Sequence, residues 1–286
     1  MLSIDNLTMH HFVVLLSCMD RPGIVHEVTG VLLDLNANIV DADQHSTDAA
    51  NGTFFMRIAV MCDTSVSLTD LKTVMGELAV SLDATIDCYD LNAPLHCALL
   101  VSKEDHCLQE LLYQWQSNGL HIHVDSIISN HNDYQSLAEW VGVPFHYISA
   151  ESKYESEQAI MRLTESTDML IMARYMQILS QGFLQQYTRP VVNIHHSFLP
   201  SFKGAKPYHQ AFARGVKLIG ATAHYATENL DEGPIIAQKV VPVSHKDTVD
   251  DLKLKGQQIE KECLVQAIRN IAAHKVVVMD QKTVVF

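Results

Sequence analysis

Three side chains that could act together on a carbonyl group lie between Asn193 and Pro234. Asn193 and His195 stand two residues apart at the end of a predicted β-strand, and Asp231 follows in a loop beside Gly233. An amide and an imidazole can donate hydrogen bonds to a developing oxyanion, and a carboxylate can activate a nucleophile. This set requires neither a metal ion nor a covalent intermediate. We therefore expect the chemistry of the chain in this stretch.

The composition describes a protein without a membrane segment. The chain has 286 residues, of which 48% are hydrophobic, enough for one large or two ordinary domains. No apolar run approaches the roughly 18 residues that cross a bilayer, and the N-terminus shows no signal segment. The six cysteines lie scattered, without metal or redox spacing. We expect buried thiols in a reducing, cytoplasmic location, with no membrane partner.

The net charge of −13 argues against nucleic acid as a partner, because an acidic protein repels phosphate backbones. The charge is uneven along the chain. Residues 1–92 hold 3 basic and 13 acidic side chains, whereas residues 169–227 hold six cations and no acid. The cations could be a chance cluster on solvated faces or a positive wall for a small anionic substrate, and counting leaves both interpretations open.

The first part of the chain, up to Asn92, reads as strand–helix–strand–strand–helix–strand. Apolar residues from Ile24 to Leu35 recur at helical spacing after the turn formed by Asp20 to Gly23. Two β-rich runs, 38–46 and 53–61, read as paired strands joined by a turn at 49–52. A second helix over 68–82 and a strand over 85–89 complete the pattern.

This ferredoxin-like βαββαβ order, with Asp-Arg-Pro-Gly-Ile-Val after the first strand, resembles the ACT domain over about residues 10–90. The resemblance implies that residues 1–92 form a regulatory or oligomerisation domain. It also implies a homo-oligomer, and an amino-acid effector bound near Asp20 to Val25. A purely structural dimerisation module is the alternative.

The second part, residues 93–286, alternates strands with helices, which favours a mostly parallel, doubly wound (Rossmann-like) α/β domain. Strands are expected at 95–102, 121–129, 144–149, 169–173 and 190–195. Ligands in such sheets bind beyond the carboxyl ends of the strands, where Asn193, His195 and Arg174 fall. The turn from Ser102 to His106 has no glycine and two carboxylates, so it is unsuited to cradle a phosphate.

Several motifs of this second part resemble the formyltetrahydrofolate-dependent formyltransferase fold over about residues 95–275. They are Asn-Ile-His-His-Ser-Phe-Leu-Pro-Ser-Phe-Lys-Gly from Asn193, Gly-Ala-Thr-Ala-His from Gly220, and Leu-Asp-Glu-Gly-Pro from Leu230. The resemblance implies that Asn193, His195 and Asp231 are catalytic. No cofactor is implied, because formyltetrahydrofolate is itself the substrate.

Further residues are implied as folate neighbours. The segment Met-Ala-Arg-Tyr-Met-Gln-Ile-Leu resembles the family's pterin-binding stretch, and it supplies Arg174, Tyr175, Met176, Ile178 and Leu179. His224, on an alternating strand, is assigned to the formyl pocket, with a core histidine as the alternative. His121 and His123 form a pair without a third ligand, so no metal site is expected.

An ACT domain ahead of this fold is the arrangement of the formyltetrahydrofolate deformylase family, which implies hydrolysis of 10-formyltetrahydrofolate to formate and tetrahydrofolate. Two departures from the glycinamide transferase pattern favour water as the acceptor: the glycine-free turn at Ser102 to His106, and His196 in place of the usual Pro. The formate would serve purine synthesis and balance one-carbon pools. The alternatives are formyl transfer to a small amine and a non-catalytic folate or amino-acid sensor.

Overall fold

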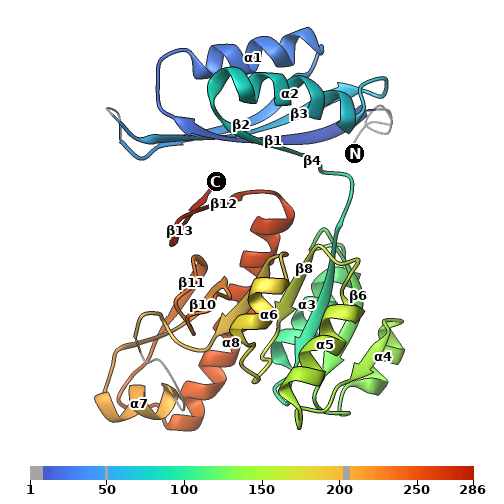
Figure 1. Cartoon of the computed structure of the whole chain (residues 1–286). Coiled ribbons are helices and arrows are strands. Elements are labelled where there is room, and N and C mark those ends of the chain that lie inside the picture. Colours follow the sequence, from blue (N-terminus) through green and yellow to red (C-terminus); the bar gives the residue numbers. More distant parts are fainter. Residues whose placement is uncertain (1–8, 49–50, 202–206) are drawn as a thin grey trace. The chain divides into compact units, whose positions relative to one another are not determined.

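The computed structural model describes residues 9–48, 51–201 and 207–286, which form two compact units (Figure 1). Unit 1 comprises residues 1–93, 273–275 and 286, and unit 2 comprises residues 94–272 and 276–285. Part of the turn predicted at 49–52 lies outside the described residues, as does the 202–206 part of the motif that begins at Asn193.

Unit 1 is a four-stranded antiparallel sheet with two helices, in the predicted βαββαβ order. Its elements are β1 (Met9–Met19), α1 (Ile24–Asp34), β2 (Asn38–Ser46), β3 (Thr53–Asp63), α2 (Leu68–Leu82) and β4 (Thr85–Asp90). The strand order is β2-β3-β1-β4. Both helices lie on one face of this sheet (Figure 1).

Local sequence explains both helices of unit 1. In α1 the buried residues Ile24, Val28 and Leu32 form an apolar stripe that packs on the sheet. Helix α2 begins with a capping box, in which Ser67 and Asp70 each satisfy a backbone N–H of the other. The core of this unit thus lies between one face of the sheet and two amphipathic helices.

Unit 2 is built on a seven-stranded sheet of order β11-β10-β9-β8-β5-β6-β7. Its elements are β5 (Leu95–Val101), α3 (His106–Gln116), β6 (Ile122–Ser129), α4 (Gln135–Val141), β7 (Phe145–Tyr147), α5 (Lys153–Leu163), β8 (Met169–Met172), α6 (Gln181–Gln186), β9 (Val191–His195), α7 (Pro207–Arg214), β10 (Leu218–Tyr225), β11 (Ile235–Pro242), α8 (Val249–Ala272), β12 (Val276–Met279) and β13 (Lys282–Val285). The last two strands pair as a separate antiparallel hairpin.

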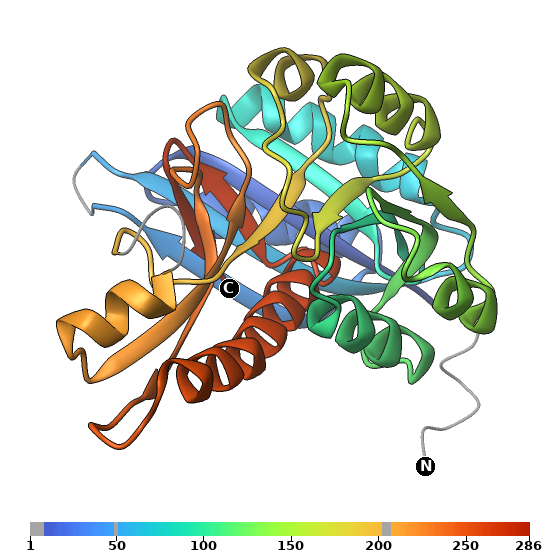
Figure 2. The ribbon, with the colours of Figure 1, turned by 90° about the horizontal axis from the view of Figure 1, so that it is seen from below.

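Helices cover both faces of the seven-stranded sheet (Figure 2). Helices α3, α4 and α8 share one apolar core with alternate residues of β5, β8 and β9. Helices α5 and α6 share a second core with the intervening residues of these strands, such as Ala98, Leu100 and Leu170. The doubly wound α/β class expected from the sequence is confirmed. No helix among the described residues is long and apolar enough to cross a membrane.

The order of the strands sets the place of the functional site. The five strands from β7 to β9 are parallel, and the chain reverses its direction of travel across the sheet between β5 and β8. Such a switch point opens a crevice beyond the carboxyl ends of the strands. Strand β10 runs antiparallel to β9, which brings His224 opposite Asn193 in register, and β11 in turn pairs antiparallel with β10 at the edge of the sheet.

Candidate active site

A cavity of about 410 Å³ lies beyond the carboxyl ends of β8 and β9. All nine residues predicted to act on the substrate line it: Asn193, His195, Asp231, Arg174, Tyr175, Met176, Ile178, Leu179 and His224. They come from the end of β9, the segment after β8, strand β10 and the loop after β10. The structure therefore brings together side chains that are distant in the sequence.

Asn193 and His224 are fixed relative to each other by the backbone and by a side-chain hydrogen bond. Asn193 Nδ2 lies 3.2 Å from His224 Nε2, and His224 Nδ1 lies 2.9 Å from the carbonyl oxygen of Tyr225. Because a carbonyl only accepts, His224 Nδ1 carries the proton and Nε2 accepts from the Asn193 amide. Burial lowers the pKa of His224, so the ring is neutral. One amide N–H of Asn193 remains for a ligand.

His195 and Asp231 form the second pair. His195 Nδ1 lies 3.2 Å from Asp231 Oδ1, and the two side chains are 6% and 9% exposed. The other ring nitrogen, His195 Nε2, is buried and has no hydrogen-bond partner among the described residues. Burial by itself raises the pKa of Asp231, but the hydrogen bond and charge of His195 outweigh it, and this pKa lies below its ordinary value. The pair thus holds an ionised carboxylate and leaves one imidazole nitrogen for a substrate.

The loop after β10 places Asp231 by its backbone. Asp231 has a left-handed φ of 57°, and the backbone N–H of Tyr225 donates to the Pro234 carbonyl at 3.0 Å. A Cβ on Gly233 would lie 1.8 Å from the Tyr225 carbonyl oxygen. Glycine is therefore required at position 233 to close the loop against β10.

The remaining wall of the cavity is largely apolar. Tyr175 and Leu179 are 6% and 9% exposed, and they also belong to the core beneath the cavity. Met176 and Ile178 are 57% and 60% exposed. An apolar wall that is buried at one end and open at the other suits an aromatic ring with a polar tail.

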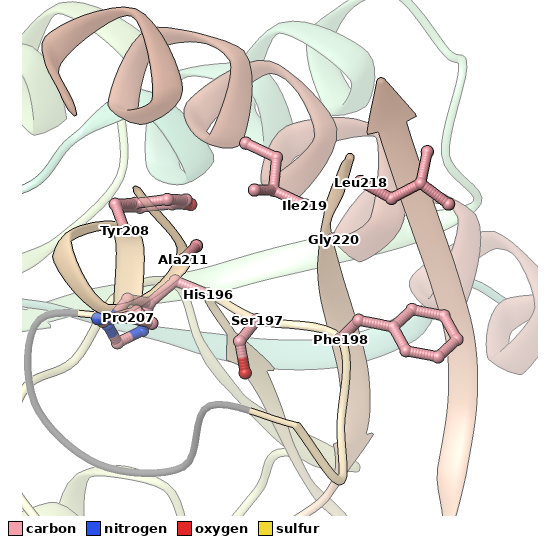
Figure 3. Close-up of a pocket in the computed structure, with 9 residues that line it drawn as sticks. All are labelled: His196, Ser197, Phe198, Pro207, Tyr208, Ala211, Leu218, Ile219 and Gly220. Atoms are coloured by element: carbon pink, nitrogen blue, oxygen red, sulfur yellow. The ribbon is translucent and has the colours of Figure 1, made fainter. Parts of the chain in front are cut away.

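The structure adds residues that sequence reasoning did not assign to the site: Met172, Gln177, Leu184, Ile194, His196, Thr227, Glu228 and Leu230. His196 also lines a second pocket of about 20 Å³, with Tyr208 of α7 and Gly220 of β10 (Figure 3). Burial, and next the positive charge of Arg174, lower the pKa of His196 to about 4. His196 is therefore a neutral wall between two pockets. The sequence had singled out His196 only as a replacement for the usual Pro, not as a residue of the cavity wall.

A buried carboxylate that no sequence pattern had indicated forms an ion pair with Arg174. Glu260 of α8 is 1% exposed; its Oε2 lies 2.8 Å from His106 Nε2 and 3.4 Å from Arg174 Nε, and its Oε1 accepts from the Tyr208 hydroxyl. Burial by itself raises the pKa of Glu260, but the His106 hydrogen bond, the Arg174 charge and the Tyr208 hydrogen bond outweigh it. The pKa is below its ordinary value, so Glu260 is an anion.

A glycine in α8 accommodates this network. A Cβ on Gly256 would lie 2.0 Å from the Tyr208 hydroxyl oxygen. Glycine inside a helix costs about 0.5–1 kcal/mol relative to alanine, and here its absent side chain lets Tyr208 reach Glu260, one turn further along α8. A glycine at position 256 of the sequence thus indicates that another group packs closely against this helix, but it does not identify Tyr208 as that group.

Two groups of described side chains have metal-ligand types within reach of one another. In one, His123 lies beside His96 and Asp125 rather than His121; His96 Nδ1 and Asp125 Oδ1 are 2.8 Å apart. In the other, His106 and Cys107 adjoin Glu260, whose oxygens already meet Arg174 and Tyr208. Neither group belongs to the lining of the 410 Å³ cavity.

Comparison with known proteins gives concordant matches. The model of the formyl transferase family matches residues 95–268, and that of the ACT domain matches residues 12–70. The formyltetrahydrofolate deformylase of Synechocystis sp. is 45% identical over 278 residues, 96% of this chain and 97% of that protein. The formyltetrahydrofolate deformylase of Bacillus subtilis is 41% identical over 278 residues, which cover 96% of this chain and 93% of that protein. The crystal structure of a formyltetrahydrofolate deformylase from Pseudomonas syringae pv. tomato superposes with a TM-score of 0.93 at 40% identity, over 99% of this chain and 97% of that one.

Proposed function

The chain belongs to the formyltetrahydrofolate deformylase family, hydrolases that act on a C–N bond, and from this premise we propose how its site releases formate. The substrate is 10-formyltetrahydrofolate, and the products are formate and tetrahydrofolate. We assign the chemistry to Asn193, His195 and Asp231, and the binding of the folate to the other lining residues predicted from the sequence, Arg174, Tyr175, Met176, Ile178, Leu179 and His224.

The formyl oxygen must become an oxyanion when water adds to the carbon. Two groups are available to stabilise this oxyanion. One is the amide N–H of Asn193 that is not donated to His224, and the other is the buried Nε2 of His195. The Asp231 carboxylate, 3.2 Å from Nδ1 of His195, orients the ring so that an Nε2–H can donate to this oxygen. Preorganised donors of this kind are typically worth 10²–10³ in kcat each.

Asp231 positions the attacking water and accepts its proton. The oxygen of water bonds to the formyl carbon, the bond from that carbon to N10 breaks, and the proton lost by water is delivered to N10. Formic acid then ionises at neutral pH. The lowered pKa of Asp231 keeps the carboxylate available as the base.

The observation that best supports water as the acceptor is the Glu260 network beside the turn that joins β5 to α3. By the general rule for doubly wound sheets, an anionic group such as a phosphate would bind at this turn. His106, the first residue of α3, instead donates to the Glu260 carboxylate, and Arg174 completes the ion pair. A buried carboxylate repels a phosphate, so a phosphorylated amine has no site here.

The decisive assay supplies 10-formyltetrahydrofolate to the full chain without an amine and measures formate. Stoichiometric formate and tetrahydrofolate are expected. Turnover that appears only after a small amine is added would identify a formyltransferase, and binding without turnover would identify a folate sensor.

We extend the proposal to the setting of the enzyme. Formate released here would feed purine synthesis and balance one-carbon pools. All six cysteines are free and buried, which supports a reducing, cytoplasmic location. The ACT domain match supports residues 1–92 as a regulatory and oligomerisation domain with an amino-acid effector, ahead of a catalytic domain over 93–286. Sedimentation analysis and the dependence of activity on added amino acids test these assignments.

A further inference from the structure

Arg174 occupies an unusual backbone conformation at the edge of the catalytic cavity. It follows β8 with a left-handed φ of 66°, which costs an ordinary L-residue roughly 1–2 kcal/mol and which glycine adopts freely. Its carbonyl accepts from the N–H of Ser102 at 3.2 Å, so this conformation is built into the switch point between β5 and β8. The cost is tolerated although a glycine would remove it, which points to a role for the side chain.

The guanidinium of Arg174 is nearly buried, and its Nε has no hydrogen-bond acceptor among the described residues. Its side chain is 11% exposed, and its only ion pair within the described ranges is the 3.4 Å approach of Nε to Glu260. This approach lacks hydrogen-bond geometry, so the buried Nε remains without an acceptor in the described part of the chain. Buried, charged donors without acceptors are costly. An occupant of the cavity would supply the missing oxygen atoms.

The surroundings fix the guanidinium in place. Glu260 is itself held by His106 and Tyr208, and Gly256 leaves room for the Tyr208 ring. Figure 3 shows Tyr208 and His196 on the walls of the small neighbouring pocket. The Arg174 charge acts on His196, whose ring centroid is 5.2 Å from that of the catalytic His195. Arg174 therefore lies toward the reacting groups rather than toward the exposed end marked by Met176 and Ile178.

A planar guanidinium recognises a carboxylate through two parallel hydrogen bonds. Formate is a planar carboxylate, and the reaction produces it in this cavity. Resting on the deformylase reaction proposed above, we infer that Arg174, positioned by Glu260, is a carboxylate subsite that receives formate as it leaves tetrahydrofolate. The folate tail also carries carboxylates, and its occupancy of Arg174 is the competing outcome of the test.

The experiment measures formate binding directly, apart from turnover. Saturation-transfer NMR on the formate proton is recorded with the full chain and tetrahydrofolate under anaerobic conditions, and formate is also titrated as a product inhibitor. We expect binding to the unaltered enzyme and at least about tenfold weaker binding to Arg174→Gly, a substitution that suits the positive φ. Arg174→Lys, which retains charge but loses the planar fork, should fall between them. Arg162→Gln, an exposed arginine of α5 outside the cavity, should bind formate as the unaltered enzyme does.

Arg174→Gly removes the arginine partner of the buried Glu260 carboxylate and leaves it only His106 and Tyr208, which could impair folding. The double variant Arg174→Gly/Glu260→Gln removes that charge and carries the same expectation for formate. Equal formate binding by the unaltered enzyme and the variants, or no formate binding at all, would overturn the subsite. So would a raised KM for the folate with unchanged formate affinity, which would leave Arg174 with only the folate-binding role assigned to it above. A failure of the unaltered enzyme to produce formate would instead refute the proposed function.

Discussion

His195 Nδ1 and Asp231 Oδ1 lie 3.2 Å apart, while His195 Nε2 is buried without a partner among the described residues. The carboxylate thus orients one ring nitrogen and turns the other toward the cavity. His195 is the last residue of β9, and Asp231 lies in a loop with a left-handed φ. Both the sheet and the loop must therefore be intact for the two side chains to meet.

Asp231→Asn tests the carboxylate. The amide keeps the size of the side chain but cannot accept a proton, so kcat should fall by about 10²–10⁴ with the fold retained. The neighbouring substitution Glu232→Gln, at an exposed position outside the cavity, is the matched control and should leave kcat within a few-fold. Steady-state formate release measures both. A kcat for Asp231→Asn that equals the control would exclude Asp231 as the base.

Asn193→Ala tests the amide donor. The substitution removes the N–H assigned to the oxyanion and also frees His224 Nε2, so kcat should fall by about 10²–10³. Because the interaction strengthens in the transition state, KM should change much less than kcat. An effect confined to KM would show that Asn193 only binds the ground-state substrate.

His196 should make stability depend on pH. Its pKa is about 4 in the folded chain against an ordinary value of 6.5, so the unfolded chain binds the proton more readily. The contribution of His196 to the free energy of unfolding is therefore fully present above pH 6.5. It decreases by up to about 3 kcal/mol as the pH falls from 6.5 toward 4. His196→Gln should flatten this part of the profile. Both tryptophans, Trp115 and Trp140, lie in unit 2, so urea unfolding followed by fluorescence reports on it. The prediction would be contradicted if the free energy of unfolding depended on pH in the same way for the unaltered chain and for His196→Gln.

Gly256→Ala should destabilise the chain although alanine is the better helix former. The new Cβ would lie 2.0 Å from the Tyr208 hydroxyl, so Tyr208 must leave Glu260 or α8 must shift. Gly76→Ala in α2 is the matched control, because nothing lies within 4 Å of its Cβ, and it should stabilise unit 1 by about 0.5–1 kcal/mol. Unfolding followed by circular dichroism and by tryptophan fluorescence separates the two units. A stabilised Gly256→Ala would mean that Tyr208 does not require the space.

Much of the fold followed from periodicity. The strand at Asn38–Ser46 and the helix at Leu68–Leu82 have the predicted bounds, because turn residues and a capping box mark their ends. The strand expected over 144–149 is only Phe145–Tyr147, since this edge strand pairs on one side alone. Local patterns contain no information about which strands become neighbours.

The same limit applies to the site. The spacing within the Asn193 motif and the loop at Asp231 pointed to the catalytic trio, whose roles remain predictions. Glu260 lies in a long helix among other polar residues, and nothing in its local sequence distinguished it from a solvated side chain. Only the packing of α8 beside α3 and α7 reveals that it is buried and paired with Arg174.

Strands β10 and β11 and the loop between them form a contiguous hairpin at the edge of the sheet. His224 and Asp231 are thus carried on one short length of chain, whereas the apolar wall comes from residues after β8. A hairpin at an edge can be exchanged between homologous chains without rethreading the parallel strands. Chimaeras that swap residues 218–242 would therefore transplant the proton-handling half of the site while the host keeps its own folate wall, which makes this hairpin a natural unit for recombination.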